Sequence, residues 1–263
     1  MLLQDKTAVV YGATGAVGSA VARTFAREGA RVFLTGRDLA RLDALVKELS
    51  AAGGQAETAE VDALDAESVG RHLDAVEAKS GTVDISFNAI GIPQEGVQGI
   101  PITELSLAGY LHPITTYTQS HFITASAAAR KMIARRAGVI LMHTAEPGKV
   151  GVPLLGGMGP AWAALESFNR ELSAECARYG VRAVCLRTTG MEETPLIDEV
   201  FGIHAEVYGQ TRKEFGDAIA QRTHRQRPTA LTELAEVTAF VASDRAAAMT
   251  GTVANLTGGL LVD

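Results

Sequence analysis

The chain has 263 residues, a formal net charge of −6 and 47% hydrophobic residues. This composition is that of a globular protein that can bury a large core, which excludes a disordered chain. No block of Lys or Arg stands out, so we expect no nucleic-acid partner, and no apolar run reaches the roughly 18 residues of a membrane helix. The first residues are too charged for a signal peptide, and only two cysteines are present. A reduced, cytoplasmic protein is therefore predicted.

Strand and helix patterns alternate along the chain. Strands are predicted over residues 7–11, 31–35, 56–61, 83–87, 138–143, 181–186 and 253–256, and helices over 16–28, 39–49, 66–79, 108–135 and 161–179. Repeated strand–helix units predict an α/β fold, a Rossmann-type doubly wound parallel sheet of about seven strands with helices on both faces. No linker divides the chain, so one dinucleotide-binding domain is predicted over 1–263, with a helical substrate-loop insertion at about 195–227.

A glycine turn follows the first predicted strand. It reads Gly12-Ala13-Thr14-Gly15-Ala16-Val17-Gly18 and opens the first helix. Glycines let a backbone turn sharply and approach a pyrophosphate, and the helix N-terminus adds free N–H groups and a positive dipole end. Glycines also occur in turns for packing reasons alone, but the strand–turn–helix context favours a dinucleotide site.

The end of the second strand bears on the choice of cofactor. An acid at this place binds the ribose 2′-hydroxyl of NAD and repels a 2′-phosphate. Here Gly36 stands near the place of the acid, and Arg37 follows it. An arginine pairs well with a phosphate, although Arg37 could instead be a solvated residue that pairs with Asp38. We favour NADP(H) over NAD(H).

These motifs resemble the short-chain dehydrogenase/reductase (SDR) family along nearly the whole chain. Asp62 looks like the family's adenine-contacting acid, and the segment 88–91 resembles its Asn-Asn-Ala-Gly turn. The segment 189–194 resembles the Pro-Gly segment whose closing Thr meets the nicotinamide side. The G-x-x-G-x-x-G spacing is that of the family's extended and atypical branches. The cofactor-binding residues implied by the resemblance are Gly12, Thr14, Gly15, Ala16, Val17, Gly18, Arg37, Asp62, Ala63, Asn88, Ala89, Ile90, Gly190 and Thr194.

The resemblance also implies where catalytic residues would stand. The family reduces carbonyls with Asn, Ser, Tyr and Lys, the last two spaced Tyr-x-x-x-Lys before an Ala-Ala-Leu-Glu-like helix. The segment 163–166 has that sequence, which places Trp162 at the Lys position and Met158 at the Tyr position. The longer spacing of the family's enoyl-reductase branch puts Leu155 at the Tyr position instead. No Tyr-x-x-x-Lys occurs in the chain.

The remaining two catalytic positions are altered as well. The Ser position falls on Ala145, or on Thr144 if the loop carries one extra residue, and the Asn position falls near Tyr117. Met, Leu and Trp exchange no proton at pH 7, so the usual acid–base mechanism is not available. His121 and His143 are weak candidates for a replacement proton donor, as are three further residues, and most of the five also have a plain structural explanation. The three are Tyr117, Thr144 and Glu146.

Two interpretations of this site stay open. In the first, hydride is transferred to an already electrophilic substrate, such as an iminium ion or a polarised alkene, in a pocket walled by Leu155, Met158 and Trp162. In the second, the protein binds NADP(H) without catalysis and acts as a sensor or an assembly partner. Trp162 could also be a core residue that fills the space of the missing Lys.

We therefore predict an NADP(H)-dependent oxidoreductase of the SDR type with an altered proton-transfer site, which reduces a carbonyl-, imine- or enone-like small molecule. The alternative is the inactive NADP(H)-binding protein. No His, Cys, Asp and Glu set has metal-ligand spacing, so no metal is expected. The family commonly forms tetramers through two long helices, here 108–135 and 161–179, and the resemblance therefore implies a homotetramer.

Overall fold

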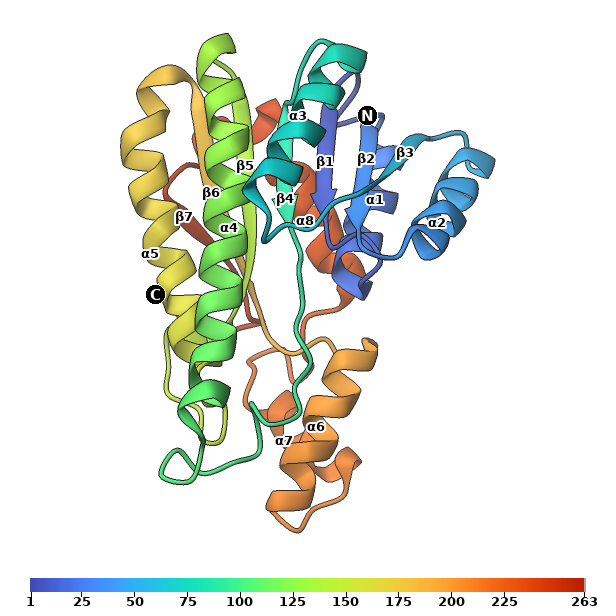
Figure 1. Cartoon of the computed structure of the whole chain (residues 1–263). Coiled ribbons are helices and arrows are strands. Elements are labelled where there is room, and N and C mark those ends of the chain that lie inside the picture. Colours follow the sequence, from blue (N-terminus) through green and yellow to red (C-terminus); the bar gives the residue numbers. More distant parts are fainter. Residues whose placement is uncertain (263) are drawn as a thin grey trace.

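The computed structural model describes residues 1–262 and contains a seven-stranded parallel sheet (Figure 1). The strand order is β3-β2-β1-β4-β5-β6-β7, and every neighbouring pair is parallel. The predicted Rossmann-type fold is confirmed. The strands are β1 (Thr7–Tyr11), β2 (Arg31–Gly36), β3 (Gln55–Glu60), β4 (Ile85–Asn88), β5 (Gly138–Ala145), β6 (Val181–Thr188) and β7 (Thr252–Leu256).

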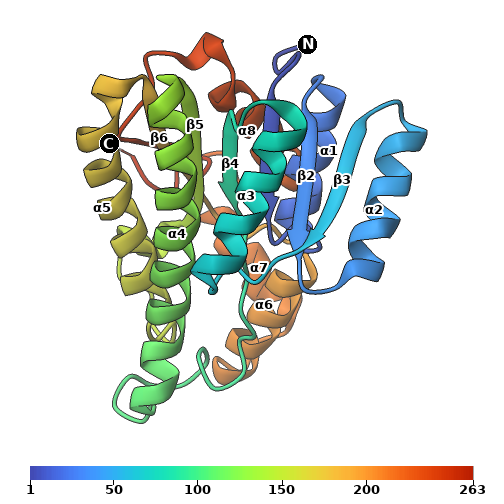
Figure 2. The ribbon, with the colours of Figure 1, turned by 45° about the horizontal axis from the view of Figure 1, so that its top comes forward.

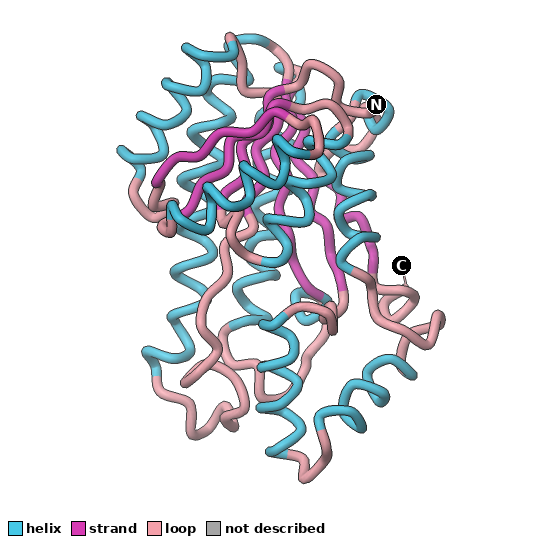
Figure 3. The backbone as a smooth tube through the Cα atoms, turned by 90° about the vertical axis from the view of Figure 1, so that its right-hand side faces the viewer, coloured by secondary structure: helices cyan, strands magenta, loops and turns pink. Residues whose placement is uncertain are grey.

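Helices cover both faces of the sheet (Figure 2). One face packs against α1 (Ala16–Arg27), α2 (Leu39–Ala51) and α8 (Leu231–Ala242). The other face packs against α3 (Ala66–Ser80), α4 (Leu107–Arg135) and α5 (Met158–Cys176). Two further helices, α6 (Pro195–Val207) and α7 (Arg212–Gln221), lie beyond the carboxyl ends of the strands, within the segment 195–227 (Figures 1 and 3).

Strand β1 shows why the sequence forms this sandwich. All five of its residues are buried. Ala8 and Val10 pack into one core cluster with α1 and α8, whereas Val9 and Tyr11 pack into the other with α3 and α4. Successive residues of a strand face opposite sides, so a strand between two helix layers needs an unbroken apolar run. The strand order reverses between β1 and β4, and ligands of such sheets bind at this switch point.

Helix α5 begins three residues before its predicted start. Met158, Gly159 and Pro160 form its first turn, preceded by Gly157. The first N–H groups of a helix have no intrahelical partner, so a proline in this turn costs no hydrogen bond. Consequently Met158 and Trp162 both lie on the helix, one turn apart. Within the described residues, no helix has the length and apolar character needed to cross a membrane.

Candidate active site

A cavity of about 450 Å³ opens at the carboxyl ends of the central strands. Its walls come from the start of α1, the segments after β4, β5 and β6, the start of α5, and helices α4, α6 and α7. Eight of the predicted cofactor residues line it, namely Gly15, Ala16, Val17, Asn88, Ala89, Ile90, Gly190 and Thr194. The other six are not part of its wall and follow the ends of β1, β2 and β3: Gly12, Thr14, Gly18, Arg37, Asp62 and Ala63.

The glycine turn has the close approaches that its sequence predicts. Gly12 has a φ of 71°, and a Cβ atom there would lie 2.8 Å from the carbonyl oxygen of Ala89. A Cβ atom on Gly18 would lie 2.4 Å from the carbonyl oxygen of Gly12. No side chain caps α1 at Gly15, and its first turn holds no acidic residue. The positive end of the helix therefore faces the cavity with free N–H groups, which fits a pyrophosphate.

Two arginines stand at the end of β2. Arg37 is exposed directly after the strand, and the Arg41 guanidinium donates to the carbonyl oxygen of Thr14 at 3.0 Å. Asp38 accepts a hydrogen bond from the backbone N–H of Arg41 at 3.1 Å and so caps α2. Arg41 brings to the glycine turn a second positive charge that sequence reasoning missed. A Cβ atom on Gly36 would meet side chains only at 3.7 Å, so packing does not exclude an acid there.

Polar side chains fix the turns after β3, β4 and β6; Asp62 is exposed, whereas Asn88 and Thr194 are buried. Asp62 accepts from the N–H of Leu64 at 3.0 Å. Asn88 donates to the Thr124 hydroxyl at 3.1 Å and accepts from the N–H of Ile90 at 3.0 Å. Thr194 caps α6 and donates to the carbonyl oxygen of Met191 at 2.8 Å. These bonds hold the backbone at the cavity wall in one conformation.

The predicted apolar wall is present in the cavity. Leu155, Met158 and Trp162 all line it, and they pack with Tyr117 of α4 in one apolar cluster. Burial raises the pKa of Tyr117 to about 12, which makes its hydroxyl a weaker acid than an ordinary tyrosine.

Thr144 does not line the cavity and is therefore not placed to donate a proton to a substrate there. Successive strand residues face opposite sides, and it is the next residue, Ala145, that lines the cavity. The buried Thr144 hydroxyl instead donates to Glu166 of α5 at 3.1 Å. Glu166 also accepts two hydrogen bonds from the Arg187 guanidinium, at 2.7 and 2.6 Å, and both residues are 5% exposed. Thr144 therefore belongs to a buried ion-pair network beneath the cavity.

Titratable side chains remain at the cavity wall. Glu146 follows β5, and its Oε2 is buried with no hydrogen-bond partner among the described residues. Burial raises the pKa of Glu146 to about 7. Burial also lowers the pKa of His121 and of His143 to about 4, so both rings are neutral at pH 7. His143 Nε2 lies 2.9 Å from the Thr188 hydroxyl.

Helices α6 and α7 supply an aromatic part of the wall that sequence reasoning missed. Phe201, His204 and Phe215 line the cavity. The rings of His204 and Phe215 stack with centroids 5.7 Å apart, and His204 Nε2 lies 3.1 Å from Gln98 Oε1. The spacing of Val200, Phe201 and His204 on one helix face was the available signal.

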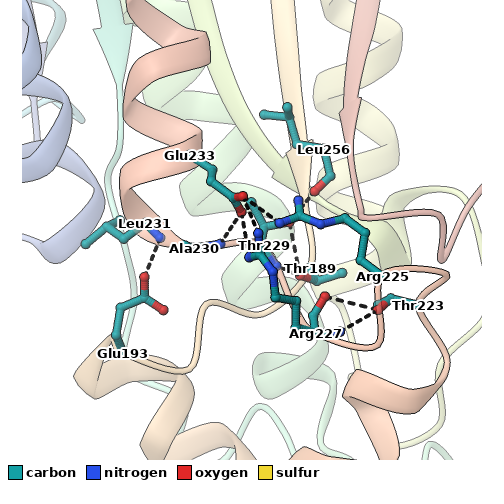
Figure 4. Close-up of polar contacts among 10 residues, drawn as sticks. All are labelled: Thr189, Glu193, Thr223, Arg225, Arg227, Thr229, Ala230, Leu231, Glu233 and Leu256. Carbon is teal, nitrogen blue, oxygen red and sulfur yellow. Dashed lines mark hydrogen bonds and ion pairs between the residues drawn. The ribbon is translucent and has the colours of Figure 1, made fainter.

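A polar cluster ties this segment back to the sheet (Figure 4). Glu233 of α8 accepts from Arg225 at 2.5 Å, from Arg227 at 2.7 Å and from the N–H of Ala230 at 2.9 Å. The Thr229 N–H donates to the Thr189 hydroxyl at 2.8 Å. The returning chain is thereby fixed to the end of β6 and to α8. In residues 1–262 no group of three His, Cys, Asp or Glu side chains is placed to hold a metal ion.

Comparison with known proteins agrees with this geometry. Residues 12–261 match the family model described as enoyl-(acyl carrier protein) reductase. A ketoacyl reductase assigned to the granaticin polyketide synthase of Streptomyces violaceoruber is 32% identical over 257 residues, 96% of this chain and 92% of that protein. The L-rhamnose 1-dehydrogenase (NAD(P)+) of Azotobacter vinelandii is 32% identical over 269 residues, 100% of this chain and 99% of that protein.

Solved structures have the same fold. An actinorhodin polyketide ketoreductase with NADPH superposes with a TM-score of 0.89 at 28% identity and covers 99% of each chain. The NAD+-bound xylitol dehydrogenase superposes with a TM-score of 0.92 over 98% of this chain and 100% of that chain, at 22% identity. The chain therefore belongs to the short-chain dehydrogenase/reductase family.

Proposed function

We propose that the protein is an NADP(H)-dependent oxidoreductase that reduces an apolar carbonyl-, imine- or enone-like small molecule, with a proton-transfer site unlike that of the usual family mechanism. The observation that carries the proposal is the cavity itself. One wall is the glycine turn and the turns after β4 and β6, and the opposite wall is apolar. A dinucleotide and a small substrate would meet in this one enclosed space.

The preference for NADP(H) rests on charge. Arg37 is exposed at the end of β2, Arg41 stands at the glycine turn, and Gly36 carries no side chain to repel a phosphate. Two guanidinium groups near one 2′-phosphate favour NADP(H) over NAD(H). The bound cofactor would supply a hydride, and the side chains around it would orient the substrate and exclude water.

The altered proton-transfer site rests on the start of α5. Met158 and Trp162 stand one turn apart at the cavity where the family resemblance places Tyr and Lys. Neither side chain can exchange a proton. Their apolar surface, with Leu155 and Phe201, favours a substrate with a flat or bulky apolar body.

The test combines a binding and a turnover measurement. Trp162 is the single tryptophan and lines the cavity, so energy transfer from its indole to NADPH reports binding directly. We expect binding, and oxidation of NADPH in the presence of members of a panel of ketones, enones and cyclic imines. Tight binding without turnover across the panel would favour the alternative, a non-catalytic NADP(H) sensor or assembly partner.

A further inference from the structure

We propose that Glu146 is the catalytic proton donor for ketone reduction in this protein, in place of the tyrosine that the chain lacks. This inference rests on the proposed function. Among the described residues that line the cavity, Glu146 is the one with a carboxyl group. With this residue as the proton donor, the substrates would include unactivated ketones.

The position of Glu146 is the first argument. It directly follows Ala145, the last residue of β5. Strand β5 pairs with β4 on one side and with β6 on the other. The carboxyl ends of those two neighbouring strands carry predicted cofactor-binding residues that line the cavity, at Asn88–Ile90 and Gly190. The Glu146 side chain, one residue beyond β5, thus lines the same cavity between these two segments.

The lack of a partner is the second argument. Glu146 lines the cavity, and its Oε2 is buried without a hydrogen bond from any described group. A buried carboxyl oxygen that is not hydrogen-bonded costs free energy, and such atoms in native structures call for an explanation. A substrate oxygen in the cavity would be the missing partner.

The electrostatic surroundings keep this carboxyl protonated near neutral pH. Burial raises its pKa to about 7, while a hydrogen bond from the backbone N–H of Glu146 itself and, to a smaller extent, the charge of Arg222 oppose the shift. Buried carboxyls of this kind act as general acids because their pKa lies near the working pH. Burial places the pKa of His121 and His143 near 4 and that of Tyr117 near 12, far from this range, and it also lowers the pKa of His204.

The proton balance of the step is simple. The carbonyl carbon accepts a hydride, with its electron pair, from the dihydronicotinamide, and the π pair of the carbonyl moves to its oxygen. That oxygen takes the proton of Glu146, whose O–H bond breaks to leave a carboxylate. The carboxylate regains a proton from solvent. A preformed iminium ion needs no such proton, because hydride addition gives a neutral amine directly.

The difference between ketone and iminium gives a sharp test. In Glu146→Gln we expect kcat/KM for ketones to fall by roughly 10²- to 10⁴-fold, and that for a cyclic iminium ion to stay within a few-fold. For the unmodified protein, ketone kcat/KM should fall about tenfold per pH unit above the Glu146 pKa of about 7, and Glu146→Gln should remove this decline. Glu175→Gln, an exposed carboxyl near the end of α5, is the matched control and should behave as the unmodified protein.

A second measurement does not depend on turnover. The infrared band of a protonated carboxyl should be present at pH 6, disappear by pH 8.5 (about 1.5 units beyond a pKa of about 7), and be missing in Glu146→Gln. Equal loss of ketone and iminium reduction, retained ketone reduction in Glu146→Gln, or absence of the band overturns the assignment. If the unmodified protein binds NADPH but reduces only iminium ions, the assignment falls and the proposed function stands. If it neither binds NADPH nor turns over any substrate, both fall.

Discussion

We propose that the choice of cofactor depends on Arg37. We expect Arg37→Ala to weaken NADPH binding by roughly 1.5–3 kcal/mol, as for the loss of a charged hydrogen bond, and NADH binding far less. Titration of Trp162 fluorescence with each cofactor measures both losses. Equal losses for the two cofactors would show that Arg37 does not contact the 2′-phosphate. The exposed Arg71→Ala, which removes an arginine of α3 that pairs with Glu67, is the control.

We propose that Met158 and Trp162 occupy the positions of the family's usual tyrosine and lysine. In a Glu146→Gln background, we expect Met158→Tyr with Trp162→Lys to raise ketone reduction at least tenfold, because a phenol with a neighbouring ammonium group can act as the acid. The same background with Met158→Phe and Trp162→Lys has the ring without the hydroxyl and should show no gain. NADPH-oxidation rates with a ketone decide between the two. Equal rates would mean that α5 does not face the reacting carbonyl.

We expect the buried ion pair of Glu166 and Arg187, beneath the cavity, to stabilise the folded protein. Glu166→Gln replaces a carboxylate that accepts two charged hydrogen bonds from Arg187 and one from Thr144. We expect the free energy of unfolding to fall by roughly 3 kcal/mol, since breaking a buried pair leaves a desolvated charge. Urea denaturation measures this change. Glu171→Gln, exposed on the same helix, should change it by less than about 0.5 kcal/mol. A loss below about 1 kcal/mol in Glu166→Gln would show that the pair adds little.

At the scale of elements, most of the fold could be predicted because its signals are local. Strand β1 and its glycine turn are found from a short, mostly apolar run and a fixed spacing of glycines. The sequence pattern predicts the start of α5 three residues too late, at residue 161. A proline ends a helix unless it lies in the first turn, and the sequence does not reveal that Pro160 lies there. The burial of Glu146 Oε2 without a partner arises in a cavity whose wall also includes residues of α4, α5 and α7, and these helices come from other parts of the sequence. No local pattern predicts such an environment.

The segment with α6 and α7 is fixed at its base by Glu233 (Figure 4). We expect Glu233→Ala to increase the rate of tryptic cleavage after Arg225 several-fold, because the variant removes the carboxylate that pairs with Arg225 and Arg227 and so loosens the chain between α7 and α8. Limited proteolysis followed by mass spectrometry measures this. Glu236→Ala, which removes a carboxylate of the same helix that pairs with Arg27, should cleave as the unmodified protein does. Unchanged cleavage in Glu233→Ala would mean that the Thr229–Thr189 bond suffices.

At the scale of the whole molecule, the predicted homotetramer stays a prediction, and the outer side of α4 and α5 is where it can be tested. Phe122 of α4 is 60% exposed, and its ring lies 5.9 Å from that of Phe168 on α5. An exposed Phe122 against a half-buried Phe168, on alanine-rich helices, favours contact with another copy of the chain. We expect light scattering at micromolar concentration to give about four times the chain mass of 27.6 kDa. Phe122→Asp should lower this mass, because it places a charge in the apolar contact, whereas Leu107→Asp, at the exposed start of α4, should not. A monomeric mass for the unmodified protein would contradict the prediction, and it would mean that Phe122 is in contact with solvent.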